Sequence, residues 1–387
     1  MPHFTEEQIK IRDLTRRIAE EHIVPIRDKY DRSHEGDFPW EIVEVLKENN
    51  LFGVYIPKEY GGAGGNITEM AIVTEELSRA CGGIALAFAA SGLGSMPILL
   101  HGSEAQKKKY LSRVAAAESL AAFALTEPDA GSDAGGIKTT AVKDGDHYIL
   151  NGTKQWITNG GEAKIYSVVA LTNPDKGARG ASAFIVEDGM PGFSYGKKED
   201  KMGIRGSATR ELIFDDCPVP AENLLGKEGM GFLVAMKTFD NSRPGVASQA
   251  LGIAQSALDA VIDFAKNHSR NGEHIISHQG VQFMLADMAT EIEAARALVY
   301  DVAQQIDAGV KDISKISAMT KLFASDVAMK VSSKAAEIFG GYGYLKDYPI
   351  EKIMRDAKIT QIYEGTNQIQ RVVIATALIH EAARKKK

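Results

Sequence analysis

The spacing of apolar residues changes twice along this chain, and the change limits the folds that it can adopt. Apolar residues first recur at helical spacing, then alternate with a period of two from about Ser119, and return to long helical stripes from Gly229. We therefore expect an α+β protein, mainly α, with an N-terminal helical domain, a central antiparallel β-domain and a C-terminal four-helix bundle. The expected domains are 1–118, 119–228 and 229–387.

Turn signals and short apolar runs define the predicted β-domain. Asp144-Gly145 and Asn151-Gly152 are both typical of hairpin turns. The apolar runs over 165–171, 183–186 and 212–214 predict strands.

Four amphipathic segments predict the helices of the C-terminal bundle. They are roughly 232–265, 280–307, 314–339 and 367–383. In the N-terminal part, Thr5-x-x-Gln8 and Ser103-x-x-Gln106 match capping boxes. An Ala-rich run that follows Ile84 is expected to be interrupted at Ser91-Gly92 and closed by Pro97.

Charge and cysteine usage exclude several classes of protein. A net charge of −6 argues against a nucleic-acid-binding surface. Two cysteines imply neither a disulfide framework nor a Cys-based metal site. No apolar run reaches the roughly 18 residues of a membrane span. A polar amphipathic helix opens the chain, so we expect a bacterial cytoplasmic protein, or a mitochondrial matrix protein whose presequence is missing.

The residues around Glu364 are the strongest candidates for chemistry. Ile359, Ile362 and Tyr363 form an apolar helical face that breaks at Gly365, so Glu364 is expected in a tight bend between two helices. A carboxylate held there would lose hydration and have a raised pKa, which suits a general base for a weakly acidic C–H. Alternatively, Glu364 merely caps the following helix. The segment alone leaves both interpretations open.

Six stretches, in order, resemble those of the acyl-CoA dehydrogenases. These flavoenzymes desaturate a thioester-linked acyl chain between its α and β carbons. The resemblance covers essentially the whole chain. The stretches are FALTEPDAGSD (123–133), KQWITN (154–159), KMGIRGSAT (201–209), FDNSRP (239–244), IFGGYGY (338–344) and IYEGTNQIQR (362–371).

The resemblance implies that the cofactor is FAD. It places Trp156 against the isoalloxazine ring and Thr158 at its N5 edge, whereas a Trp read alone is typically a half-buried core residue. Leu125 and Thr126 would bond the pyrimidine side, and Ser132 a pyrophosphate oxygen. The full set of expected FAD contacts is Phe123, Leu125, Thr126, Gly131, Ser132, Trp156, Thr158, Arg270, Gln279, Gly340, Gly341, Thr366 and Gln368.

Two departures from the family pattern affect this set. The stretch between Arg270 and Gln279 is shorter than the family's Arg-x-x-Phe-Gly segment and lacks its Phe. We expect Arg270 still to meet the FAD pyrophosphate. Glu337 stands where a Gln often occurs, and an acid there would repel a pyrophosphate, so no contact is assigned to it.

By resemblance, Glu364 removes the pro-R α-proton while the β-hydride goes to flavin N5, and the Glu364 N–H bonds the thioester carbonyl. Some relatives place the base at the position of Ser242, which cannot serve. Arg243 would lie near the adenine end of CoA, or else form a surface ion pair. The expected substrate contacts are Ser91, Ser132, Phe239, Arg243, Tyr363 and Gly365.

The acyl group is less constrained. No basic residue occurs between Ala80 and His101, which favours a neutral acyl chain; a short or medium straight chain and a branched or alicyclic group both remain open. An acyl-CoA oxidase or a non-catalytic scaffold on the same fold is the rival class. The resemblance also implies an electron-transferring flavoprotein as electron acceptor and a homotetramer whose FAD contacts cross subunits.

Overall fold

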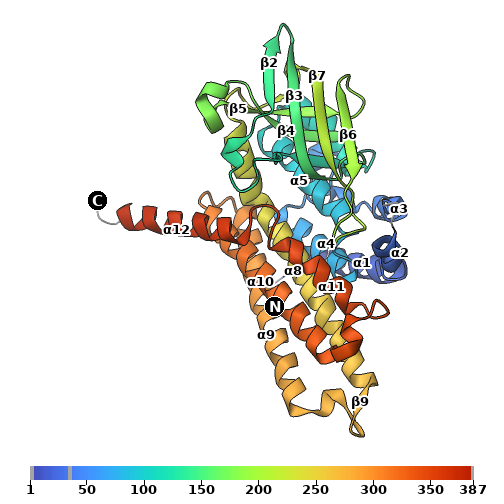
Figure 1. Cartoon of the computed structure of the whole chain (residues 1–387). Helices are drawn as coiled ribbons and strands as arrows, with labels where there is room; N and C mark the ends of the chain where they lie inside the picture. The colour runs from blue at the N-terminus through green and yellow to red at the C-terminus, as the bar shows by residue number, and fades with distance from the viewer. Residues whose placement is uncertain (1–3, 34–36, 385–387) are drawn as a thin grey trace.

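The computed structural model describes residues 4–33 and 37–384. A β-sheet lies at one end of the molecule and long helices extend to the other, with the N-terminal helices beside their junction (Figure 1). This is the predicted arrangement of helical, β and helical parts.

Seven short or medium α-helices make up the described N-terminal part. They are α1 (Glu6–Ile18), α2 (Arg27–Arg32), α3 (Trp40–Glu48), α4 (Ile67–Ala80), α5 (Leu86–His101), α6 (Glu104–Gln106) and α7 (Ser112–Ala115). Both predicted capping boxes are present, at the starts of α1 and α6. The expected break at Ser91-Gly92 is wrong, because α5 continues through Pro97. Gly94 shows why this helix is rich in small residues. A Cβ on Gly94 would lie 2.3 Å from the backbone N of Ala122, so α5 packs directly on β1.

The middle part is one mainly antiparallel sheet. Its strands are β1 (Ala121–Ala124), β2 (Thr140–Asp144), β3 (His147–Thr158), β4 (Ile165–Leu171), β5 (Ala181–Glu187), β6 (Phe193–Lys198), β7 (Thr209–Pro220) and β8 (Leu224–Leu225). The order is β6-β7-β3-β2-β4-β5-β8, with β1 pairing β4 in parallel. Parallel pairing also occurs between β2 and β4.

One of the two predicted hairpin turns is correct. Asp144 pairs with His147 across the β2–β3 turn. Asn151-Gly152 is not a turn but lies inside β3, where the register with β7 shifts. A Cβ on Gly152 would lie 2.6 Å from Oγ1 of Thr139, so the glycine marks a bulge at a close approach.

The C-terminal part contains α8 (Gly231–Asn267), α9 (Gln279–Asp307), α10 (Ser314–Phe339), α11 (Ile350–Thr360) and α12 (Asn367–Arg384). Val261, Ile292, Val331 and Ile353 share one apolar core, so the four packed helices are α8 to α11. The prediction that 367–383 supplies the fourth bundle helix is therefore wrong. α12 projects away from the body (Figure 1), and its only buried described residues are Asn367 and Gln370.

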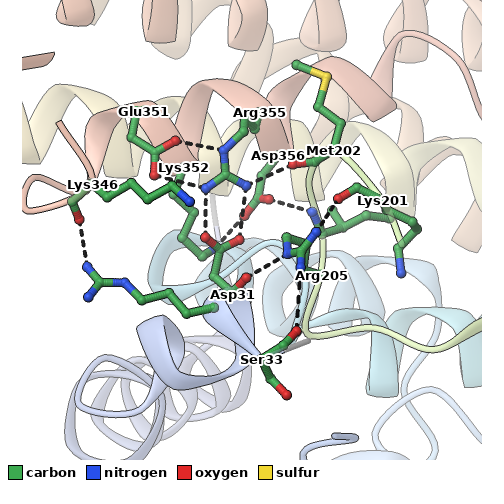
Figure 2. Close-up of polar contacts among 12 residues, drawn as sticks. Asp31, Ser33, Lys201, Met202, Arg205, Lys346, Glu351, Lys352, Arg355 and Asp356 are labelled. Atoms are coloured by element: carbon green, nitrogen blue, oxygen red, sulfur yellow. Dashed lines mark hydrogen bonds and ion pairs between the residues drawn. The ribbon is translucent and has the colours of Figure 1, made fainter. Parts of the chain in front are cut away.

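An ion-pair cluster joins all three parts of the chain (Figure 2). Arg355 of α11 donates to both carboxylate oxygens of Asp31 on α2, at 3.0 and 2.6 Å, and to the carbonyl of Met202 at 2.8 Å. Arg205, which follows β6, donates to the Asp31 carbonyl at 2.6 Å. The N-terminal helices and the β-domain are thus both tied to α11.

Asp356 makes a second connection in the same cluster. One of its oxygens accepts the backbone N–H of Ile204, and the other accepts from Lys352, which also lies 3.2 Å from Sγ of Cys81. Because α11 leads directly into the bend that contains Glu364, these contacts fix the helix that delivers that residue.

Candidate active site

A cavity of about 430 Å³ lies where the three parts of the chain meet. Apolar side chains of α4 and α5 form one wall, among them Met70, Leu86 and Leu93. Strand ends of the β-domain and the first half of α8 form the others, and the bend after α11 completes it. A largely apolar cavity with a few converging polar groups is typical of a small-molecule site.

The bend that carries Glu364 differs from the predicted helical face. α11 ends at Thr360, and Ile362 is 47% exposed. Glu364 and Gly365 have φ of 51° and 91°, so the left-handed conformation expected of the glycine extends to the glutamate. A non-glycine residue rarely adopts this conformation unless its surroundings hold it.

The carboxylate of Glu364 does not cap the following helix. Its Oε2 accepts a hydrogen bond of 2.6 Å from Oγ of Ser242 on α8, and the residue lines the cavity. Thr366 caps α12 instead, because its Oγ1 accepts the N–H of Ile369 at 3.2 Å. The alternative of a capping role is therefore excluded by the geometry.

Burial raises the pKa of Glu364, and three neighbours oppose this change: the hydrogen bond from Ser242 and the charges of Arg243 and Lys321. Arg243 is buried and forms an ion pair with Asp240 at 3.1 Å, so it is not a surface residue. Its charge also acts on Glu364. Arg243 therefore lies close to Glu364, and its expected position near the adenine end of CoA stays a prediction.

The β-domain presents a flat aromatic side chain to the cavity. Trp156 is 56% exposed and has a φ of 58°, at a point where the register between β3 and β7 shifts. It is therefore not the half-buried core residue of the simpler interpretation. Ser132, Thr126 and Thr158 line the cavity with it. An exposed aromatic ring with hydroxyl groups beside it fits a flat heterocyclic cofactor.

A buried ion pair holds the loop that carries Thr126 and Ser132. Lys154 is wholly buried and donates to Oε1 of Glu127 at 2.6 Å and to the carbonyl of Leu125 at 3.0 Å. Glu127 also accepts the N–H groups of Lys138 and Thr139. Burial lowers the pKa of Lys154 to about 8, against the charge of Glu127. Lys154 lies in the KQWITN stretch, but the sequence pattern predicted no role for it.

Most residues expected to contact FAD or substrate line this cavity. They are Phe123, Leu125, Thr126, Gly131, Ser132, Trp156, Thr158, Phe239, Arg243, Tyr363, Glu364 and Gly365. Ser91 does not, contrary to expectation. Its side chain is buried, donating to the Ala87 carbonyl at 2.8 Å and accepting the Ala121 N–H at 3.3 Å, so it ties α5 to β1. Ala89 and Ala90 line the cavity in its place.

A second group of expected FAD contacts lies elsewhere in the chain. Arg270 belongs to a small hairpin, β9 (Ser269–Arg270) with β10 (Glu273–His274), which gives the shortened segment its path. A Cβ on Gly340 would lie 3.5 Å from Nη2 of Arg270, so the two are neighbours. The hairpin lies at the end of the bundle remote from the sheet (Figure 1). Gln279 and Gly341 adjoin this end in sequence, at the start of α9 and the end of α10.

Two side chains of the site were missed from the sequence. Tyr363 donates through its hydroxyl to Oε1 of Gln249, a buried residue of α8 that lines the cavity. Lys321 of α10 donates to the carbonyl of Gly365 at 2.8 Å. Neither lies in a motif, and both reach the site only through helix packing. Only their polar character within apolar helical stripes could have signalled them.

Within the described part of the chain, no three His, Cys, Asp or Glu side chains are grouped to hold a metal ion. None of the described helices is both long and apolar enough to cross a membrane.

Three family models together match most of the chain. They are those of the acyl-CoA dehydrogenase N-terminal domain at residues 5–118, the middle domain at 122–217 and the C-terminal domain at 229–379.

Named relatives and solved structures agree with these matches. The short-chain specific acyl-CoA dehydrogenase of Clostridium acetobutylicum is 47% identical over 96% of this chain and 98% of its own. The acryloyl-CoA reductase (NADH) of Anaerotignum propionicum is 49% identical over 96% and 94%.

Butyryl-CoA dehydrogenase from Megasphaera elsdenii superimposes with a TM-score of 0.94 at 46% identity, over 98% of this chain and 100% of its own. A chain in a structure described as the electron transferring flavoprotein of Acidaminococcus fermentans has a TM-score of 0.94 and 49% identity, over 98% and 99%.

FAD is the cofactor of this family. An acyl-CoA dehydrogenase from Bacillus anthracis, solved in complex with FAD, has a TM-score of 0.92 and 35% identity, over 99% of this chain and 70% of its own. The exposed ring of Trp156 and the hydroxyl groups beside it fit such a cofactor. The chain therefore belongs to the acyl-CoA dehydrogenase family, and it is an oxidoreductase that uses FAD.

Proposed function

We propose that this protein introduces a double bond between the α and β carbons of a short, straight-chain acyl-CoA, with Glu364 as the base. The observation that carries the proposal is the position of Glu364: a poorly hydrated carboxylate at the wall of the cavity that Trp156 also lines. A raised pKa makes such a carboxylate a stronger base toward a weakly acidic C–H.

The chain's own groups prepare the proton transfer. Ser242 holds one oxygen of the Glu364 carboxylate, leaving the other for the α-hydrogen. The left-handed backbone presents the Glu364 N–H as a donor to the thioester carbonyl, which becomes enolate-like as the proton leaves. Bound FAD supplies the acceptor for the β-hydride. Apolar residues of α4 and α5 exclude water from the acyl chain.

The proposed acyl group is short and straight. Relatives named as short-chain specific and as butyryl-CoA dehydrogenase support it. The cavity side chains of α4 and α5 carry no charge, which suits a neutral acyl group. Gln249 and Tyr363, bonded to each other, add a polar, fixed part to the wall. A branched or alicyclic acyl-CoA is the alternative, and the rates of flavin bleaching with straight, branched and cyclic substrates distinguish the two.

We propose an electron-transferring flavoprotein as the redox partner, supported by the description of one similar structure. The relative named acryloyl-CoA reductase (NADH) gives a second candidate, reduction of a short enoyl-CoA at the same site. Glu364 would then return the α-proton, while the hydride for the β carbon would come from reduced FAD. The named relatives are bacterial, which supports the bacterial cytoplasm over the mitochondrial matrix.

We further propose a homotetramer in which FAD contacts cross subunits. Arg270 and Gly340 lie at the end of the bundle remote from the sheet, so a second copy must bring them to an FAD bound beside Trp156. α12 begins directly after Thr366 and contains Gln368. It exposes apolar side chains: Val372 is 58% and Ile379 66% exposed. Such a surface is typical of an interface.

Glu364→Gln tests the assigned base. Anaerobic flavin bleaching should be fast with butyryl-CoA in the unaltered protein, and slower with isobutyryl- and cyclohexanecarboxyl-CoA. Glu364→Gln should keep FAD and lose about 1,000-fold in bleaching rate, because only the base is removed. Glu44→Gln, an exposed carboxylate of α3, is the control and should leave the rate unchanged. Substantial bleaching by Glu364→Gln contradicts the assignment, and preference for a branched or cyclic substrate contradicts the acyl group.

A further inference from the structure

Lys321 is a wholly buried lysine that points at the catalytic bend. Its Nζ donates to the carbonyl of Gly365 at 2.8 Å and to Oδ1 of Asn367 at 2.9 Å. Gly365 follows Glu364 directly in the chain, and Asn367 lies three residues after it. Burying a lysine is costly unless its charge is used, and helix α10 gains nothing from these contacts within itself.

The bend needs such support. Two consecutive left-handed residues, Glu364 and Gly365, form its centre. For the glutamate this conformation is unfavourable and persists only where neighbours hold it. Gln370 of α12 bonds the carbonyls of both residues, at 3.2 and 3.0 Å. Lys321 binds the Gly365 carbonyl together with Gln370, and it brings a positive charge to the bend.

Asn367 extends the support to α10 as a whole. Its side-chain amide donates to Ser325 at 2.9 Å and to Asp326 at 2.7 Å. Gln361 at the start of the bend also donates to Asp326, at 2.6 Å. Residues 321–326 of α10 therefore hold the bend on both sides of Glu364, with Lys321 at the start of this segment.

Charged groups reach Glu364 from two helices. On α8, Arg243 acts on it, with Asp240 paired to that arginine. On α10, Lys321 acts on it, and Asp326 acts in turn on Lys321. Tyr363 is adjacent and its hydroxyl donates to Gln249, so it adds no charge. Lys321 and Arg243 are thus the two cations that favour an ionised Glu364.

We propose, on the basis of the proposed function, that Lys321 is a positioning residue for proton abstraction. Its bonds to the bend hold the left-handed conformation that aims the Glu364 carboxylate, and its charge favours the ionised base. Burial lowers the pKa of Lys321 to about 7, so the group carries its charge below that pH.

The test is the pH profile of anaerobic flavin reduction by butyryl-CoA in Lys321→Met and Lys321→Gln. Both should bind FAD and lose about tenfold or more in limiting rate, because the base is no longer held in its productive position. The acid limb should move to higher pH, since loss of a nearby cation raises the pKa of Glu364. Lys321→Gln keeps a donor for Gly365, so it should recover part of the rate but not the position of the limb.

Lys352→Met is the matched control. Lys352 is also buried but contacts Asp356 and Cys81 rather than the bend, so its loss should lower the melting temperature and leave the acid limb in place. An unchanged rate and limb in the Lys321 variants overturns the inference. An equal shift of the acid limb in Lys352→Met also overturns it. If both Lys321 variants fail to bind FAD while Lys352→Met binds it, the inference is overturned as well, because Lys321 would then serve only the fold. Substantial flavin bleaching by Glu364→Gln would contradict the proposed function itself, which distinguishes that failure from a failure of the Lys321 inference.

Discussion

Trp156 and Glu364 both have a left-handed backbone, with φ of 58° and 51°, although neither is glycine. Each such residue costs about 1–3 kcal/mol, which neighbouring contacts must offset. The left-handed backbone directs each side chain differently from a residue in a regular strand or helix. The ring of Trp156 faces the cavity, and the carboxylate of Glu364 faces Ser242. At the scale of residues, the site depends on a few side chains held in unfavourable conformations.

Ser242→Ala should leave a smaller fraction of Glu364 ionised at acidic pH. The hydrogen bond from Ser242 lowers the pKa of Glu364, so its removal raises that pKa. The bleaching rate should fall by about tenfold at acidic pH and less at alkaline pH, where the base is ionised in either case. Ser248→Ala is the control, because Ser248 is buried in the same helix and donates to the Pro244 carbonyl rather than to Glu364. An identical pH profile for the two variants would remove Ser242 from the site.

At the scale of elements, α11 connects the three-domain ion-pair cluster to the catalytic bend. Burial disfavours an ionised Asp31, but the hydrogen bonds from Arg355 and the charges of Lys352 and Arg205 outweigh it, so the pKa of Asp31 is lowered. The Asp31–Arg355 pair thus stabilises the junction while Asp31 is charged. The sequence showed none of these partners together, because Asp31 and Arg355 lie at opposite ends of the chain.

Arg355→Met should destabilise the fold by about 3 kcal/mol, because it leaves the Asp31 carboxylate buried without its main partner. Thermal melting of the FAD-loaded protein measures the loss. Arg12→Met breaks an exposed pair with Asp13 and should change stability by less than about 0.5 kcal/mol. Equal effects of the two substitutions would contradict a structural role for the cluster.

The same pair predicts how stability depends on pH. A carboxylate whose pKa is lowered by folding contributes stability above its ordinary pKa of about 4, and this is lost as the pH falls through the lower, folded value. The difference in melting temperature between unaltered protein and Arg355→Met should therefore shrink as the pH falls below about 4. A difference that stays constant would show that Arg355 acts through packing alone.

At the scale of the whole molecule, α12 and the β9–β10 hairpin have surfaces that one chain leaves uncovered. If the proposed tetramer covers α12, Val372→Asp should lower the oligomer mass in solution and weaken FAD retention. Val142→Asp is the control: Val142 is 62% exposed on β2, away from α12, and its replacement should leave the mass unchanged. Light scattering and the bound-flavin absorbance measure both effects. An unchanged mass in Val372→Asp would leave α12 outside the interface.

The sequence by itself determined the order of helical and β parts, the two capping boxes and the residues of the flavin and base motifs. These rest on local rules, since periodicity and capping depend on neighbours a few residues apart. Where a long-range contact competed, the local rule failed. Gly152 reads as a turn but is a bulge against Thr139, and Ser91-Gly92 reads as a break inside what is a continuous α5.

Only the tertiary structure decided how the site works. It excluded the capping role of Glu364 by placing Ser242 at 2.6 Å, removed Ser91 from the cavity, and brought Arg243 and Lys321 to the base from two different helices. Each of these depends on packing between segments far apart in the chain, and no spacing in the sequence encodes it. The motifs thus identified the reacting residue, while the fold set its hydration, its charge environment and its direction.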